Sequence, residues 1–192
     1  GEDRTVSVVT AEMVKDLRAR TGAGVLDCRK ALEEAAGDVA KATELLHKRG
    51  AAQAVKKESR EANEGIIGHY VHTGARVAAL VEVNCESDFV ARTEAFQTLA
   101  HDLAMQVVAA QPLYVKVEAV PAEVIEEMRA RYRAEIEGAG KPEAIIEQVV
   151  EGKLKKFYEE TCLMSQPYIK DGNVTVGDVV KQTIAKTGEN IV

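Results

Sequence analysis

Apolar side chains recur at helical spacing along the first part of the chain. Over residues 10–50 they form three short stripes that glycine-containing breaks separate. Residues three or four positions apart share one face of a helix, so each stripe predicts a short amphipathic helix. Thr10 and Asp38 are suited to cap the first and third helices, because their side-chain oxygens can accept an orphan backbone N–H. We therefore expect a small three-helix bundle, with its third helix ending near Gly50.

The apolar spacing changes to that of strands after a polar stretch. Residues 51–64 are rich in Ala, Lys and Glu and lack an apolar stripe, which indicates a solvated helical extension or a linker. Two β-rich runs follow at residues 66–72 and 76–85, around the short gap Thr73-Gly74-Ala75. Such runs on either side of a glycine-containing gap predict a β-hairpin. In the second run apolar residues alternate with other side chains, so one face is expected to be buried.

Helical spacing returns after the predicted hairpin. A long stripe covers residues 93–111, and two more helices are expected to start near Pro121 and Pro142, because proline fits the first turn of a helix. Thr175 resembles the start of a capping box that opens a last helix. Asn190-Ile191-Val192 has the character of a strand that is beginning. A hairpin followed by several helices favours an α+β fold over a parallel α/β fold.

Length and composition support a division of the chain into three parts. The 192 residues suffice for one domain of usual size and a small appendage. Apolar residues make up 46% of the chain and aromatics only 4%, so a sizeable and mainly aliphatic core is expected. We place an N-terminal three-helix module at residues 1–50, a linker or helical extension at residues 51–64, and an α+β core domain at residues 65–192.

Charge and cysteine content limit the classes of function and the cellular compartments that the sequence favours. The net charge of −6 disfavours a direct role on nucleic acid, because phosphate contacts need clustered Lys and Arg. The cysteines Cys28, Cys85 and Cys162 are odd in number and lack metal-ligand spacing, which fits a reducing compartment and predicts neither a disulfide framework nor a zinc site. No apolar run approaches the roughly 18 residues of a membrane span. We expect a cytoplasmic protein, with an organelle matrix or stroma as alternatives.

Catalytic and cofactor chemistry is not indicated. The sequence has neither G-x-x-x-x-G-K-[ST] nor G-x-G-x-x-G after a strand, so no nucleotide cofactor is expected. His69 and His72 lie three apart on a predicted strand, which points their side chains to opposite faces and disfavours a shared metal ion. Glu86, Asp88 and Glu94 lack a nearby nucleophile or oxyanion site. We predict that the protein is not an enzyme. A hydrolase that uses Asp88 and Glu86 is the third of three functional hypotheses; the other two are given below.

The segment Ser87-Asp88-Phe89-Val90 joins a predicted strand to a predicted helix, a common location for working residues. Two interpretations are open. In the structural one, Ser87 caps the helix, Asp88 is a first-turn carboxylate and Phe89 is a core aromatic. In the functional one, Asp88 and Phe89 protrude and act on a partner, because aromatic residues often dominate docking.

The segment Thr21-Gly22-Ala23-Gly24-Val25-Leu26 is also open to two interpretations. Its two glycines break the preceding helix, because they permit the backbone angles of a tight turn. In the structural interpretation the segment is a helix–helix turn followed by core residues. In the functional interpretation it presents its backbone and two apolar side chains, Val25 and Leu26, to a partner.

Several runs of the sequence resemble a known family. Residues 17–32 (LRARTGAGVLDCRKAL) are similar to the N-terminal signature of bacterial-type elongation factor Ts, and residues 64–70 (EGIIGHY) are similar to the same family. Residues 81–92 (VEVNCESDFVAR) resemble its second signature, and the likeness extends to residues 188–192 (GENIV). The resemblance covers nearly the whole chain and indicates a short form of the family.

The resemblance implies a function and a partner. Elongation factor Ts is the guanine-nucleotide exchange factor for elongation factor Tu, the GTPase that delivers aminoacyl-tRNA to the ribosome. The family's N-terminal module, of ubiquitin-associated type, docks on the nucleotide domain of the GTPase; the matching residues here are Thr21, Gly22, Ala23, Gly24, Val25 and Leu26. A Thr-Asp-Phe-Val segment of its core intrudes near the bound Mg²⁺ and promotes the loss of that ion; the matching residues here are Ser87, Asp88, Phe89 and Val90.

The sequence departs from the family pattern in two places. Members often carry a Met pair after Thr-Gly-Ala-Gly, where this chain has Val25 and Leu26, which are less pliable than methionine. Members usually continue past Asn-Ile-Val into a further strand, whereas this chain stops at Val192, and short members can pair as homodimers that complete the core. A homodimer is therefore one expectation. A non-exchanging interaction module, binding a helix or a nascent chain, is the alternative function.

Overall fold

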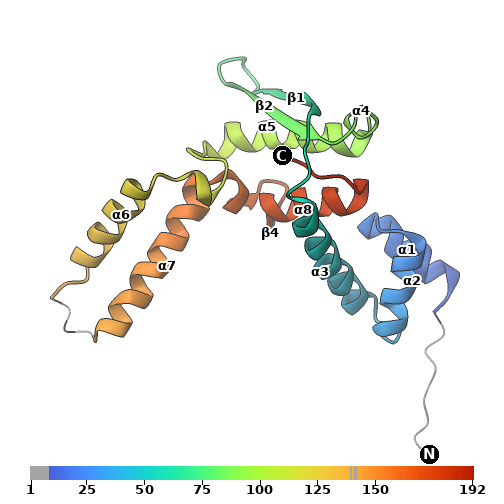
Figure 1. The fold of residues 1–192 in the computed structure, drawn as a ribbon, viewed down its shortest axis with the longest axis horizontal. Coiled ribbons are helices and arrows are strands. Elements are labelled where there is room, and N and C mark those ends of the chain that lie inside the picture. The colour runs from blue at the N-terminus through green and yellow to red at the C-terminus, as the bar shows by residue number, and fades with distance from the viewer. Residues whose placement is uncertain (1–8, 139, 141) are drawn as a thin grey trace, which may run out of the picture. The chain divides into compact units, whose positions relative to one another are not determined.

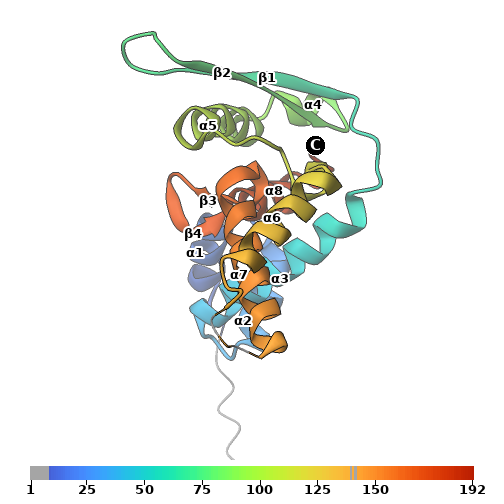
Figure 2. The same ribbon diagram turned by 90° about the vertical axis from the view of Figure 1, so that its left-hand side faces the viewer.

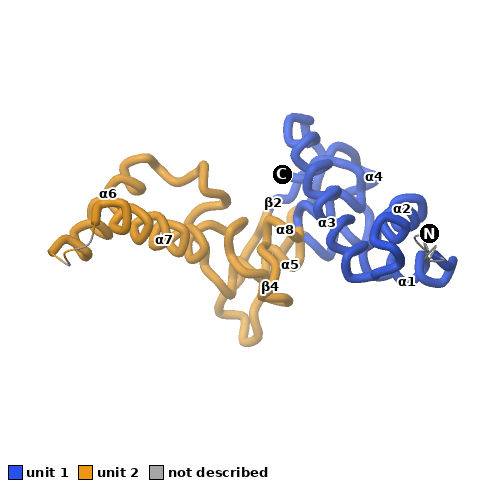
Figure 3. Tube along the Cα trace, turned by 90° about the horizontal axis from the view of Figure 1, so that it is seen from below, with its two compact units in different colours: residues 1–66, 82–99, 180–192 blue, residues 67–81, 100–179 orange. Residues whose placement is uncertain are grey.

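The computed structural model describes residues 9–138, 140 and 142–192, so residues 1–8 of the predicted N-terminal module lie outside the described residues. Helices and two small sheets make up the fold (Figure 1), and the predicted α+β class is confirmed. The chain forms two compact units, each built from separated stretches (Figure 3): unit 1 contains residues 1–66, 82–99 and 180–192, and unit 2 contains residues 67–81 and 100–179.

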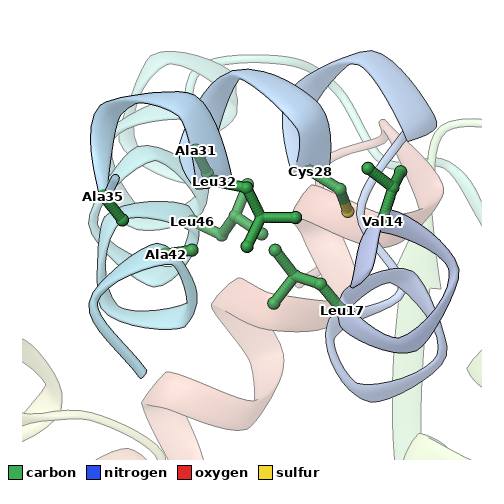
Figure 4. Packing of buried hydrophobic residues seen from close by; sticks show 8 residues of the cluster. All are labelled: Val14, Leu17, Cys28, Ala31, Leu32, Ala35, Ala42 and Leu46. Atoms are coloured by element: carbon green, nitrogen blue, oxygen red, sulfur yellow. The ribbon is translucent and has the colours of Figure 1, made fainter. Parts of the chain in front are cut away.

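Three helices at the start of unit 1 form the predicted bundle. They are α1 (Ala11–Thr21), α2 (Val25–Glu34) and α3 (Val39–Lys57). Both predicted caps are confirmed, since Thr10 Oγ1 accepts a hydrogen bond from the Met13 N–H at 3.2 Å and Asp38 Oδ1 accepts one from the Lys41 N–H at 3.1 Å. The helices enclose a cluster of aliphatic and small side chains (Figure 4), namely Val14, Leu17, Cys28, Ala31, Leu32, Ala35, Ala42 and Leu46.

The third helix is longer than its sequence pattern predicts. The pattern places its end near Gly50, but α3 continues through this residue to Lys57. A Cβ at Gly50 would lie 3.0 Å from the Cβ of Ala185 in α8 (Val176–Thr187), so this glycine permits close helix packing and does not end the helix. The helical-extension interpretation of residues 51–64 holds as far as Lys57. The three-part division of the chain stays a prediction.

The predicted hairpin is present as β1 (Glu64–Val71) and β2 (Ala78–Cys85), which pair in a two-stranded sheet beside α5 (Glu94–Ala110) (Figure 2). Burial alternates along β2 as expected, because Val83 is buried whereas Leu80 and Glu82 are exposed. On β1, Gly68 is buried against the backbone of Ala100 in α5. One face of the hairpin therefore packs on this helix, and the opposite face is exposed.

Residues 191–192 extend the hairpin with a short third partner. Ile191 forms an antiparallel bridge with Cys85, the last residue of β2. The backbones of Asn84 and Val192 exchange two hydrogen bonds, of 2.7 and 3.0 Å. Among the described residues, the strand start predicted for Asn190-Ile191-Val192 is present only as this single bridge to the end of β2, and not as a strand of its own.

The rest of unit 2 consists of helices and a small second sheet. The predicted helices that follow Pro121 and Pro142 are α6 (Ala122–Ala134) and α7 (Glu143–Thr161), which run side by side (Figure 1). After them β3 (Pro167–Tyr168) pairs antiparallel with β4 (Asp171–Thr175). The predicted capping box opens α8: Thr175 Oγ1 accepts from the Asp178 N–H at 3.1 Å, and Asp178 Oδ2 accepts from the Thr175 N–H at 3.0 Å.

The close packing of β1 on α5 requires a glycine at position 68. A Cβ there would overlap the carbonyl group of Ala100. We predict that Gly68→Ala lowers the free energy of unfolding by about 1–3 kcal/mol, because overpacked side chains force the backbone to shift. Urea denaturation followed by circular dichroism measures this change.

The matched control is Gly152→Ala in α7, where the described residues leave the space around an added Cβ open. This substitution should be neutral or raise the free energy of unfolding by up to about 1 kcal/mol, because alanine favours a helix over glycine. Equal effects of the two substitutions would contradict the packing described for the hairpin.

Candidate functional site

The segment Ser87-Asp88-Phe89-Val90 forms the start of a one-turn helix, α4 (Asp88–Ala91), directly after β2. Ser87 is extended, with φ −135° and ψ 154°, and its Oγ accepts a hydrogen bond from the Val90 N–H at 3.4 Å. Its predicted capping role is therefore confirmed. Val90 and Ala91 are buried, so one side of this turn lies within unit 1.

Phe89 lies on the surface. Its exposed fraction is 80%, so the interpretation of Phe89 as a core aromatic is wrong. The contrast with Phe96, which is fully buried in α5, is physical: α4 has one turn, and Val90 and Ala91 already occupy its inner side. Burying a phenylalanine side chain contributes about 1.5–3 kcal/mol, and this fold forgoes that gain at Phe89. The ring is thus available to a partner.

Asp88 directly precedes Phe89 in the chain and forms an ion pair with Arg92. Arg92 donates a hydrogen bond to Asp88 Oδ2 at 2.7 Å, and both side chains are partly or largely exposed. A solvent-exposed pair of this kind contributes roughly 0–1 kcal/mol, so it orients the carboxylate without fixing it. The sequence analysis includes Arg92 only in the family-like run and did not predict this pair, although its spacing of four residues from Asp88 on a helix signals one.

Glu86 is engaged in structural bonds. Its Oε1 accepts a hydrogen bond from the Asn190 N–H at 2.7 Å and lies 3.4 Å from the Arg60 guanidinium. The hydrogen bond from Asn190 lowers the pKa of Glu86 below its ordinary value of 4.5; partial loss of water opposes this, and the charge of Arg60 lowers the pKa further. A carboxylate held in this way is poorly suited to move a proton, which weighs against the hydrolase hypothesis.

The turn before α4 also contacts Glu189, a residue that the sequence reasoning singled out only as part of the family resemblance. The Ser87 hydroxyl donates a hydrogen bond to Glu189 Oε1 at 2.6 Å, and the Ser87 N–H donates one to Oε2 at 2.9 Å. Glu189 follows the glycine that ends α8. A Gly-Glu-Asn run after a helix indicates a chain reversal with polar side chains, but it does not reveal which segment those side chains meet.

The segment Thr21-Gly22-Ala23-Gly24-Val25-Leu26 forms the turn between α1 and α2. Gly22 has φ +69° and its N–H donates to the Arg18 carbonyl, so a left-handed glycine ends α1. The Thr21 hydroxyl donates to the Leu17 carbonyl at 2.7 Å. Val25 and Leu26 are 51% and 71% exposed, so their interpretation as core residues is wrong. This turn places two apolar side chains on the surface of unit 1.

The described residues offer no metal site around these turns. Among them, no group of three or more His, Cys, Asp or Glu side chains is arranged to hold a metal ion. His69 and His72 are both exposed, and each makes a separate contact: His69 through its carbonyl with His101 Nδ1, and His72 with the hydroxyl of Tyr70. None of the helices within the described part of the chain has the length and apolar character needed to cross a membrane.

Comparison with known proteins finds a family and several relatives that match nearly the whole chain. The family described as "Elongation factor TS" matches residues 5–192. The chain is 54% identical to Elongation factor Ts of Thermosipho melanesiensis, over 96% of this chain and 94% of the relative. It is 56% identical to Elongation factor Ts of Thermotoga maritima, over 95% of this chain and 91% of the relative. The relative from Carboxydothermus hydrogenoformans, with the same name, is 52% identical over 96% and 85% of the two chains.

These similarities identify a translation elongation factor. The chain belongs to the elongation factor Ts family. The family resemblance read from the sequence is thereby confirmed. The roles of individual residues at the two exposed turns stay predictions.

The bond between Glu86 and Asn190 predicts a pH dependence of stability. Because the folded protein lowers the pKa of Glu86, the carboxylate contributes stability above its ordinary value of 4.5, and this contribution is lost as the pH falls through the lowered pKa. We expect Glu86→Gln to reduce the slope of unfolding free energy against pH below about pH 4.5. Urea denaturation at a series of pH values measures this slope.

A control variant separates this effect from the loss of one negative charge. Glu94→Gln removes an exposed carboxylate from the first turn of α5. It should change the slope less than Glu86→Gln does. The same slope in both variants would show that the bond from Asn190 does not govern the titration of Glu86.

Proposed function

We propose that this protein promotes the release of GDP and Mg²⁺ from elongation factor Tu, and so acts as a guanine-nucleotide exchange factor during translation elongation. The observation that supports this most directly is the exposure of Phe89, 80%, on a capped and anchored turn in a member of the elongation factor Ts family. An exposed aromatic ring on a firm backbone suits insertion into a partner.

In this proposal the four residues of the turn have unequal roles. Phe89 acts as a wedge that holds the GTPase in a conformation that binds Mg²⁺ poorly. Asp88 competes for polar groups of the displaced element, and it can exchange its exposed partner Arg92 for such groups. Ser87 and Val90 support the wedge from within, because Ser87 caps α4 and Val90 is buried.

The turn between α1 and α2 is the proposed docking surface. Val25 and Leu26 bury their exposed apolar surface against the nucleotide domain of the GTPase, while Thr21, Gly22, Ala23 and Gly24 set the shape of the turn. Docking and wedging then use different side chains of unit 1. The two steps can therefore be separated by substitution.

The proposed activity requires no bond-breaking chemistry. Exchange couples two ligands of one GTPase: if this protein lowers the affinity for nucleotide by some factor, nucleotide lowers the affinity for this protein by the same factor. Loss of Mg²⁺ weakens nucleotide binding because the ion bridges protein and phosphate oxygens. We accordingly propose that the protein is not an enzyme and that its partner is elongation factor Tu, without direct contact to nucleic acid.

The test is the release of fluorescent GDP from elongation factor Tu at increasing concentrations of this protein. We predict that Phe89→Ala lowers the maximal release rate by about tenfold or more, because an aromatic hot spot of an interface contributes about 2 kcal/mol or more.

Leu26→Ala should instead raise the half-saturating concentration by about fivefold and leave the maximal rate largely unchanged, because it removes apolar docking surface.

Two outcomes would contradict the proposal. If the intact protein does not accelerate GDP release, it is not an exchange factor for this GTPase; binding of other partners without any effect on release would then favour the non-exchanging interaction module. Equal losses of docking and maximal rate on Phe89→Ala would show that Phe89 is an anchor and not a wedge.

We propose a second copy of this chain as a further partner. On the hairpin face opposite the buried Gly68 and Val83, the side chains of Ile67, Val71 and Leu80 are 56%, 57% and 75% exposed. Apolar side chains gathered on one sheet face favour association. We expect light scattering after size-exclusion chromatography to give the mass of two chains, and Leu80→Glu to give the mass of one. A single-chain mass for the intact protein would overturn self-association.

A further inference from the structure

The turn that carries Phe89 is held by a side chain from the far end of the sequence. The carboxylate of Glu189 accepts three hydrogen bonds from this turn: from the Glu86 N–H at 3.1 Å, from the Ser87 N–H at 2.9 Å and from the Ser87 hydroxyl at 2.6 Å. Hydrogen bonds to an ionised acceptor are roughly twice as strong as neutral ones. One side chain thus fixes two consecutive peptide units directly before α4.

The segment that supplies Glu189 is itself well fixed. Gly188 has φ +80°, which lets the chain turn back after α8, and its N–H donates to the Ile184 carbonyl. Asn190 is 2% exposed; its N–H donates to Glu86 Oε1 at 2.7 Å, and its side-chain amide donates to the Arg60 carbonyl at 2.8 Å. Glu86 and residues 189–190 therefore exchange hydrogen bonds in both directions.

Phe89 depends on this support because its ring has little packing of its own. At 80% exposure, the direction of the ring is set by the backbone of α4, which has a single turn. Val90 and Ala91 anchor one side of that turn by burial. On the other side, the Ser87 hydroxyl accepts from the Val90 N–H and donates to Glu189, so the cap is itself oriented by Glu189.

We infer that Glu189 is a positioning residue that fixes the orientation in which Phe89 is presented to a partner. This inference rests on the proposed exchange function. Without the carboxylate, the two N–H groups and the hydroxyl turn to water, and α4 samples more orientations. Only some of these orientations bring the ring into a productive position, so the competent fraction of the protein falls. Docking through Val25 and Leu26 does not use Glu189 and keeps its strength.

The exchange assay tests whether removal of the Glu189 carboxylate lowers the maximal rate of GDP release without weakening docking. Glu189→Ala should lower the maximal rate of GDP release roughly tenfold, with the half-saturating concentration changed less than about twofold. Glu189→Gln retains the length of the side chain and one acceptor oxygen, so it should restore part of the lost rate. The control is Glu159→Ala, which removes an exposed carboxylate from α7 and should leave both quantities unchanged. A loss of docking without a loss of maximal rate would overturn the inference.

A second measurement observes the position of the ring directly and does not depend on the GTPase. The chain contains no tryptophan, so Phe89→Trp introduces a single indole at this position. In that background, Glu189→Ala should lower the fluorescence anisotropy of the indole, and Glu159→Ala should not. Unchanged anisotropy would overturn the positioning role. A fall in anisotropy in a protein that does not accelerate GDP release would support positioning and overturn the proposed function.

Circular dichroism and urea denaturation show whether each variant is folded. If Glu189→Ala is unfolded, Ser87→Ala takes its place, because it removes the 2.6 Å hydroxyl bond to Glu189 together with the cap bond from the Val90 N–H and keeps both backbone bonds to Glu189. It should lower both the indole anisotropy and the maximal rate relative to the protein with Ser87 intact. An unchanged rate and an unchanged anisotropy in folded Ser87→Ala would overturn the inference.

Discussion

Residues 189–192 pair with residues 84–87 through hydrogen bonds that run in both directions, and the exposed turn that follows depends on this pairing. Asn84 and Val192 exchange backbone bonds, Ile191 bridges Cys85, and Glu189 accepts from the turn itself. The neighbouring Cys85 thiol donates to the Ser87 carbonyl at 3.1 Å, and burial raises the pKa of this thiol, which keeps it a neutral donor. The N–H groups of Glu86 and Ser87 and the Ser87 hydroxyl thereby have partners, while the Phe89 ring is exposed.

The same part of unit 1 also supports the turn between α1 and α2. A Cβ at Gly22 would lie 3.1 Å from Lys186 Cδ, and one at Gly50 would lie 3.0 Å from Ala185 Cβ, so the end of α8 packs closely on the helical bundle. From there the chain passes through Gly188 to Glu189. For the proposed function this continuity matters, because the turn proposed to dock and the turn proposed to act on the GTPase belong to the same unit.

The sequence predicts well those features that depend on neighbouring residues. The caps at Thr10, Asp38 and Ser87 are local, because each oxygen meets an N–H three positions along the chain. The prediction of a helix end at Gly50 was wrong because the packing partner of this glycine, Ala185, is distant in sequence. The sequence alone does not distinguish a glycine that ends a helix from one that permits close packing. For the same reason, spacing left the exposure of Phe89 open between two interpretations and did not indicate the contacts of Glu189. The family resemblance indicated the segments but not these contacts.

Because a ribosome makes the chain from its N-terminus, the bond between Ser87 and Glu189 can form only long after Ser87 has been added. Glu189 follows Ser87 by 102 residues, so at ordinary synthesis rates it is added roughly 5–20 seconds later. During that interval the bundle and the hairpin can form, but the turn carrying Phe89 lacks both the Glu189 carboxylate and the bridge from Ile191 to Cys85. In the proposed function, a nascent chain therefore has the docking turn between α1 and α2 before the turn carrying Phe89 is held in place, and that support comes only once residues 189–192 have been added.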